Sequence, residues 1–166
     1  MDGEELLERV TTTVQETYLK IGDSYGSISL YYPFEGDAQG IEREFRSAIG
    51  ESFPGMVLEV LPQRLRVIVS EDDCRRISKL PVKSTIRDMV EITKGRASID
   101  DVKTSITERY PDSRFVKSEY VDFDWLLLFP DDVDDDVYCL SVELGQVTYH
   151  RFSKEEFTKL GFEIPE

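Results

Sequence analysis

Apolar side chains recur at two different spacings along this chain. Between residues 3 and 21 they fall three or four positions apart, which predicts an amphipathic helix that ends at Gly22. Residues 27–32 are rich in strand-forming residues, alternate in polarity and stop at Pro33, a pattern typical of a β-strand. The positions expected on the buried face of the helix are Leu6, Leu7, Val10, Val14, Tyr18 and Ile21.

The same reasoning divides the rest of the chain into short elements. Further helices are expected at 37–50, 71–80, 85–94, 99–110 and between Ser153 and Gly161. Further strands are expected at 56–61, 65–69, 115–120, 123–129, 137–142 and 147–152. Pro62-Gln-Arg and Glu143-Leu-Gly-Gln146 have the composition of hairpin turns, with Gly145 able to take a positive φ. Ser153 and Glu156 have the spacing of a capping box.

The helices and strands come in groups rather than in strict alternation. This order predicts an α+β fold with an antiparallel sheet and flanking helices. A chain of 166 residues has the length of one domain, and neither a repeat nor a linker composition interrupts it. We therefore expect residues 1–166 to form a single domain.

The most apolar stretch lies in the expected strand 123–129. Alternation would place Phe123, Trp125 and Leu127 on one face. Because both faces become apolar toward Phe129, we expect this strand to be central and Trp125 to be buried. Truncating a buried tryptophan costs about 3–5 kcal/mol, so Trp125→Ala should unfold the domain or nearly so.

Charge is distributed very unevenly. The segment 119–150 holds nine acids and no Lys or Arg, whereas residues 64–117 hold 13 bases and 9 acids, a net charge of +4. We expect the basic middle to pair with its acidic flanks. The formal charge of the whole chain is −14. It disfavours binding to nucleic acid or to anionic membrane surfaces, since both need Lys and Arg.

Five aspartates in the six residues 131–136 invite a metal hypothesis, because Ca²⁺ and Mg²⁺ bind clustered carboxylates. The run lacks the central glycine and the terminal glutamate of an EF-hand loop. We expect instead an exposed loop that joins two antiparallel strands, because unpaired charges are costly to bury. We assign no metal site, and whether the loop takes a divalent cation is left open.

Side chains for nucleophilic catalysis are few. His150 is the only histidine, and alternation places it on the strand face opposite Tyr149 and Arg151, at the surface or rim of the protein. The phosphate-binding patterns G-x-x-x-x-G-K-[ST] and G-x-G-x-x-G do not occur, so no cofactor is expected. His150→Ala should leave any function largely intact.

The number and spacing of the cysteines indicate the cellular compartment of the protein. Cys74 and Cys139 are too far apart for a C-x-x-C pair, which is typical of reduced thiols in a cytosol. The longest apolar run is five residues, far below the ~20 of a membrane span. The acidic start has no signal-peptide pattern. We expect a cytoplasmic protein.

Leu30-Tyr-Tyr-Pro33, after Lys20-Ile-Gly22 at the end of the first helix, carries a resemblance to a known group. The chain resembles, over its first 35 residues or so, an uncharacterised bacterial protein family of unknown function. This resemblance implies a bacterial cytoplasmic origin and no catalytic residue.

Two functions follow from these observations. The first is a non-enzymatic module that binds a basic protein partner through its acidic segment. The alternative is a small enzyme whose paired carboxylates do acid–base work, with Asp122 and Asp124 on one strand face and Glu143 nearby. A concave acidic site would favour the enzyme, and a flat or convex one the binding module. The oligomeric state is open. The candidate binding residues are Asp122, Asp124, Asp131, Asp132, Asp134, Asp135, Asp136 and Glu143.

Overall fold

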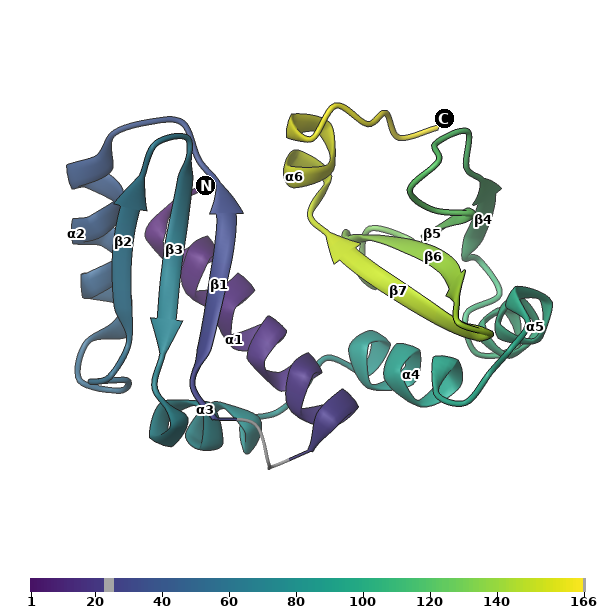
Figure 1. The fold of residues 1–166 in the computed structure, drawn as a ribbon, viewed down its shortest axis with the longest axis horizontal. Coiled ribbons are helices and arrows are strands. Elements are labelled where there is room, and N and C mark those ends of the chain that lie inside the picture. The colour runs from purple at the N-terminus through teal and green to yellow at the C-terminus, as the bar shows by residue number, and fades with distance from the viewer. Residues whose placement is uncertain (23–25, 166) are drawn as a thin grey trace. The chain divides into compact units, whose positions relative to one another are not determined.

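The computed structural model describes residues 1–22 and 26–165. Its contacts divide the chain into two units, Met1–Arg87 and Asp88–Glu166, each with its own sheet (Figure 1). We describe each unit by itself. That residues 1–166 form a single domain stays a prediction.

The first unit consists of a three-stranded antiparallel sheet and three helices, followed by the start of α4. The strands lie in the order β1-β3-β2, so the β2–β3 hairpin adds β3 beside β1. Its turn places Gln63 at φ 62°, directly after Pro62. The elements are α1 (Gly3–Ile21), β1 (Ile28–Pro33), α2 (Ala38–Ile49), β2 (Val57–Leu61), β3 (Arg64–Val69), α3 (Glu71–Ser78) and α4 (Ser84–Thr93).

One face of this sheet is buried by the helices. Leu65, Val67 and Val69 alternate along β3 and belong to one apolar core with residues of α1 and α2. The predicted helix face is confirmed at Leu6, Val10, Val14 and Tyr18, whereas Ile21 is exposed. Gln15 of α1 is also buried, and its side-chain amide donates to the backbone carbonyls of Ile77, Leu80 and Pro81.

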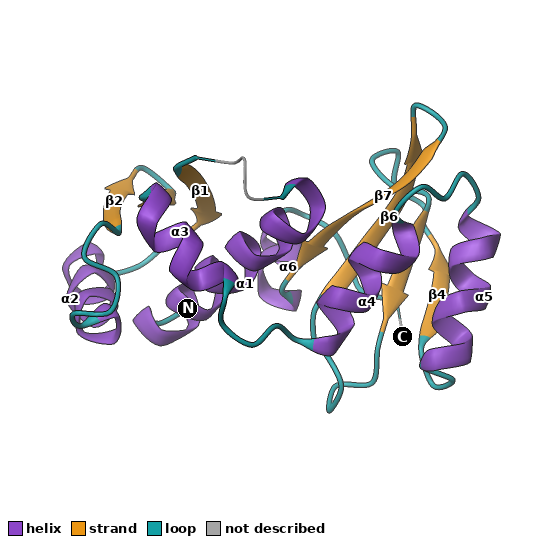
Figure 2. Cartoon of the chain, turned by 90° about the horizontal axis from the view of Figure 1, so that it is seen from below, coloured by secondary structure: helices purple, strands orange, loops and turns teal. Residues whose placement is uncertain are grey.

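The second unit is built on a four-stranded antiparallel sheet in the order β4-β5-β6-β7. Figure 2 shows α5 beside the edge strand β4. The β6–β7 hairpin turns through Leu144 and Gly145, both at positive φ. Its further elements are α5 (Ile99–Arg109), β4 (Arg114–Lys117), β5 (Trp125–Leu128), β6 (Val137–Glu143), β7 (Gln146–Phe152) and α6 (Lys154–Lys159).

The two faces of the second sheet have different coverings. Leu126 and Leu128 pack in one core with Phe157 of α6. This helix begins with the predicted capping box, in which Ser153 and Glu156 bond to each other's backbone. On the other face the ammonium of Lys103, from α5, lies 4.1 Å from the ring centre of Trp125.

The expected role of Trp125 is only partly right. β5 is an interior strand, as predicted. Trp125 itself is half-buried: it is the first residue of the strand, and the Lys103 ammonium lies over its ring. Phe123 precedes the strand, so alternation does not apply to it, and it packs with Leu126 on the opposite face.

The α+β class, with antiparallel sheets and flanking helices, is confirmed. What the pattern did not predict is that the strands form two sheets rather than one. Within the described ranges 1–22 and 26–165, no helix has both the length and the apolarity to cross a membrane.

Candidate functional site

The acidic segment contributes both exposed and buried carboxylates. Seven acids are exposed and two, Asp134 and Asp136, are buried with 3% and 4% of their surface accessible. The exposed ones are Glu119, Asp122, Asp124, Asp131, Asp132, Asp135 and Glu143.

These exposed acids lie at two opposite ends of the second sheet. Residues 119–124 lead into β5 and residues 129–136 leave it, and the four residues of β5 span about 13 Å. Trp125 pairs with Leu140 across the antiparallel ladder, so the end of β6, with Glu143, lies beside the start of β5. The single negative region of the sequence therefore becomes two separate surfaces.

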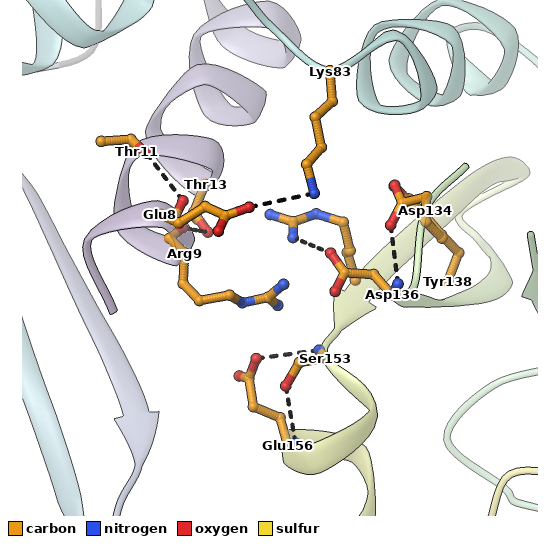
Figure 3. A network of polar contacts seen from close by, with 11 residues as sticks. Glu8, Arg9, Thr11, Thr13, Lys83, Asp134, Asp136, Tyr138, Ser153 and Glu156 are labelled. Carbon is orange, nitrogen blue, oxygen red and sulfur yellow. Dashed lines mark hydrogen bonds and ion pairs between the residues drawn. The ribbon is translucent and has the colours of Figure 1, made fainter. Parts of the chain in front are cut away.

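The segment 131–136 lies in the loop 129–136 that joins β5 to β6, so its predicted place between two strands is confirmed, but only part of it is exposed. The Tyr138 hydroxyl donates to Asp134 at 2.6 Å, and the backbone N–H of Asp136 donates to the same carboxylate at 2.9 Å (Figure 3). The guanidinium of Arg151 lies 2.7 Å from the Asp136 carboxylate, with both side chains almost fully buried. The prediction of exposure is right for Asp131, Asp132 and Asp135. It is wrong for the other two aspartates because each has buried partners.

A backbone turn in the loop explains why these two aspartates are buried. The N–H groups of Val133 and Asp134 both donate to the carbonyl of Pro130, forming a tight turn. Asp134 then accepts from the backbone two residues further on, as aspartates in turns commonly do. The turn directs Asp134 toward β6, where the strand ladder sets Tyr138 opposite Arg151. Both buried aspartates thus stabilise the loop.

The three carboxylates Asp134, Asp135 and Asp136 can place one oxygen each within 4.8 Å of one another. Two of these carboxylates already bind the Tyr138 hydroxyl and the Arg151 guanidinium. We assign no metal ion to this cluster.

At the other end of the sheet, the loop before β5 is tied to the end of β6. The Asp124 backbone N–H donates to the carbonyl of Leu140 at 2.8 Å, and the Asp124 carboxylate accepts from the backbone N–H of Val142 at 3.3 Å. Ser141 donates to the carbonyl of Asp122 at 3.4 Å. Asp122 and Asp124 do not share a strand face, since β5 begins only at Trp125. The loop nevertheless brings them close to the strand that ends at Glu143.

Apolar side chains at this end were missed from the sequence. Val121 and Leu144 are fully exposed, and Val142 is partly exposed. One signal was available for Leu144, because a two-residue hairpin turn usually has Asn, Asp or Gly at that position.

An open groove of about 450 Å³ lies at the loop end of the sheet. Asp131 is the one candidate acid that lines it, and its carboxylate pairs with the Lys154 ammonium at 2.6 Å. Arg114 also lines the groove and donates to the carbonyl of Pro165 at 2.7 Å. The groove is therefore mixed in charge rather than acidic.

His150 is exposed, as predicted. It lies opposite Cys139 in the β6–β7 ladder, so the geometry does bring a thiol and an imidazole to neighbouring positions. Cys139 is buried, however, and burial raises the pKa of its thiol to about 12. A nucleophilic cysteine needs a lowered pKa, so the environment of Cys139 is the opposite of a reactive one.

The basic middle of the chain pairs with acids, as expected for several of its residues. In the first unit, the Lys83 ammonium lies 3.6 Å from the carboxylate of Glu8 (Figure 3). Arg66 likewise pairs with Glu59 on the neighbouring strand, at 3.2 Å.

Searches among curated proteins and among solved structures each found no match to this chain. A family model, by contrast, covers far more than the stretch at the N-terminus that carried the resemblance. With residues 3–161 matched, the chain belongs to the family described as "Domain of unknown function, E. rectale Gene description (DUF3877)".

Proposed function

We propose that this chain is a protein-binding module whose second unit takes a basic protein partner. The observation that carries the proposal is the set of seven exposed carboxylates on 119–143, a segment without Lys or Arg. Complementary charge accelerates encounter and suppresses wrong partners. The buried Asp134 and Asp136 do not belong to this surface, because they are bound within the fold.

A cytoplasmic location is part of the same proposal. It rests on the two separated cysteines, and both Cys74 and Cys139 are free and buried in the structure. The family description names E. rectale, a bacterium, which agrees with the bacterial origin that the resemblance implied.

The enzyme alternative needs its carboxylates inside a concave site. Asp122, Asp124 and Glu143 lie on an exposed loop and at a strand end, and the groove of the second unit includes none of the three. No geometric observation therefore favours this alternative over binding.

Binding of short synthetic peptides tests the proposal. A peptide of alternating lysine and leucine and one of alternating glutamate and leucine are titrated into the protein by calorimetry. The first should bind, the second should not, and the affinity should fall steeply between about 0.01 M and about 0.5 M salt.

Two variants with equal charge test where the peptide binds. Both remove six negative charges, changing the formal −14 to −8. The test variant neutralises Glu119, Asp122, Asp131, Asp132, Asp135 and Glu143. The control neutralises Glu4, Glu5, Glu35, Glu51, Glu91 and Glu108, which are also exposed. The proposal requires loss of binding in the test variant alone. Equal weakening in both would show a nonspecific charge effect and overturn it.

A further inference from the structure

Two apolar side chains protrude completely from the second unit. Leu144 has a relative exposure of 106% and Val121 of 103%, and no other large hydrophobic residue in the described part of the chain exceeds 55%. Val142, on the strand before the turn, is 44% exposed. A single exposed aliphatic side chain is ordinary, but several at one place indicate an interaction surface.

These residues lie at the same end of the sheet. Val121 is adjacent to Asp122, whose carbonyl accepts from Ser141 of β6. Leu144 follows two residues after Val142, whose backbone N–H donates to the carboxylate of Asp124. The hydrogen bonds between the loop 118–124 and β6 therefore hold both segments together. We call Val121, Val142, Leu144 and the exposed acids around them the hairpin-tip surface.

The backbone at Leu144 is costly for a leucine. Its φ is 52° and that of Gly145 is 74°, as in a type I′ turn between the paired residues Glu143 and Gln146. The left-handed region is unfavourable for residues with a large side chain, and Asn, Asp or Gly normally fill this position. Leu144 has no compensating burial. Neither turn formation nor core packing accounts for leucine here.

The charge around the apolar residues indicates what would cover them. The segments 118–124 and 141–146 contain Glu119, Asp122, Asp124 and Glu143 and no base. Basic residues flank the surface: Lys117 at the end of β4, Lys103 of α5, whose ammonium lies over the Trp125 ring, and Arg96, whose carbonyl accepts from Val147. The surface itself combines aliphatic side chains with a negative rim, the complement of a segment in which Lys or Arg alternates with aliphatic residues.

We infer that the hairpin-tip surface is the docking site for such a basic, apolar protein segment, with Leu144 and Val121 as its anchors. This inference rests on the proposed function and gives it a location. Charge brings the partner to the surface, and burial of the two aliphatic side chains provides affinity that salt does not screen. The acids of the loop 129–136 take no part.

Leu144→Asn combined with Val121→Ser tests the anchors. Asparagine accepts the positive φ, and both positions are exposed, so the unfolding midpoint should stay the same or rise. The variant is titrated with two peptides, one alternating lysine with leucine and one alternating lysine with serine. The parent should prefer the leucine peptide by about tenfold or more, the factor expected from burying aliphatic side chains. The variant should lose this preference and keep the salt-dependent binding of the serine peptide.

A second variant separates this inference from the general proposal. Asp131→Asn, Asp132→Asn and Asp135→Asn neutralise the other acidic end, and the inference requires little change in the leucine preference. Suppose that the peptides bind, that the triple aspartate variant loses the preference for the leucine peptide, and that the anchor variant keeps it. The docking site then lies elsewhere, and only the inference fails. If neither peptide binds the parent protein, the proposed function fails as well.

Discussion

Asp136→Asn should destabilise the second unit strongly, although it replaces only one side-chain oxygen by nitrogen in a loop rich in aspartate. The Asp136 carboxylate lies 2.7 Å from the Arg151 guanidinium, and the two side chains are 4% and 2% exposed. Removing one partner of a buried ion pair takes that counter-charge away from the other in a desolvated place, which typically costs about 3–5 kcal/mol. Against a total stability of about 5–15 kcal/mol, that is a large fraction.

The chain offers a convenient probe and a matched control for this experiment. Trp125, the only tryptophan, lies in the second sheet, so its fluorescence during urea unfolding reports on that unit. Asp135 is the neighbouring residue and is exposed, so Asp135→Asn should change the free energy of unfolding by no more than about 0.5 kcal/mol.

A double-mutant cycle isolates the ion pair. Asp136→Asn combined with Arg151→Met removes both charges and should cost less than the sum of the two single changes. If the free energy of unfolding of the Asp136→Asn variant lies within about 1 kcal/mol of the parent value, the buried ion pair does not stabilise the loop and our account of these aspartates is wrong.

Three further predictions concern the packing of individual side chains and helices. Trp125→Ala should cost about 2 kcal/mol rather than unfold the unit, because the ring is half-buried and covered by Lys103; circular dichroism in urea measures this. Gly3→Ala should cost about 1–3 kcal/mol, since its new Cβ would clash with the backbone of Glu44 in α2; a thermal melt that matches the parent would contradict the close packing of α1 on α2. Cys139 should resist a thiol reagent at pH 8. Because folding raises its pKa from 9.0 to about 12, the folded state retains the proton more strongly, and this contribution to stability should be complete below pH 9 and be lost as the pH rises toward 12; unfolding midpoints measured across that interval check the sign.

Local sequence signals were sufficient for most of the elements. Gly22 and Gly50 follow α1 and α2, and Ser153 with Glu156 starts α6, because caps depend on residues only a few positions apart. Alternation identifies a strand but not its neighbours, so the division of the strands into two sheets did not follow from it.

For the candidate site, too, the local features could be predicted from the sequence and the long-range contacts could not. The loop 131–136 and its charge follow from composition, but the burial of Asp136 depends on Arg151, which only the β6–β7 register brings close. The hairpin turn was expected from Gly145, yet the exposure of Leu144 was not. The hydrophobic pattern assigns an aliphatic residue to the core by default, and the turn position before Gly145 was the one local signal against that assignment.

Amide chemical shifts of the isotope-labelled protein, titrated with the peptide of alternating lysine and leucine, test the docking site most directly. The account predicts that the largest changes map to residues 119–122 and 142–146, with little change at 131–135 and in the sheet of the first unit. Changes centred on the loop 129–136 or on the first unit, or no saturable change at low salt, would contradict it.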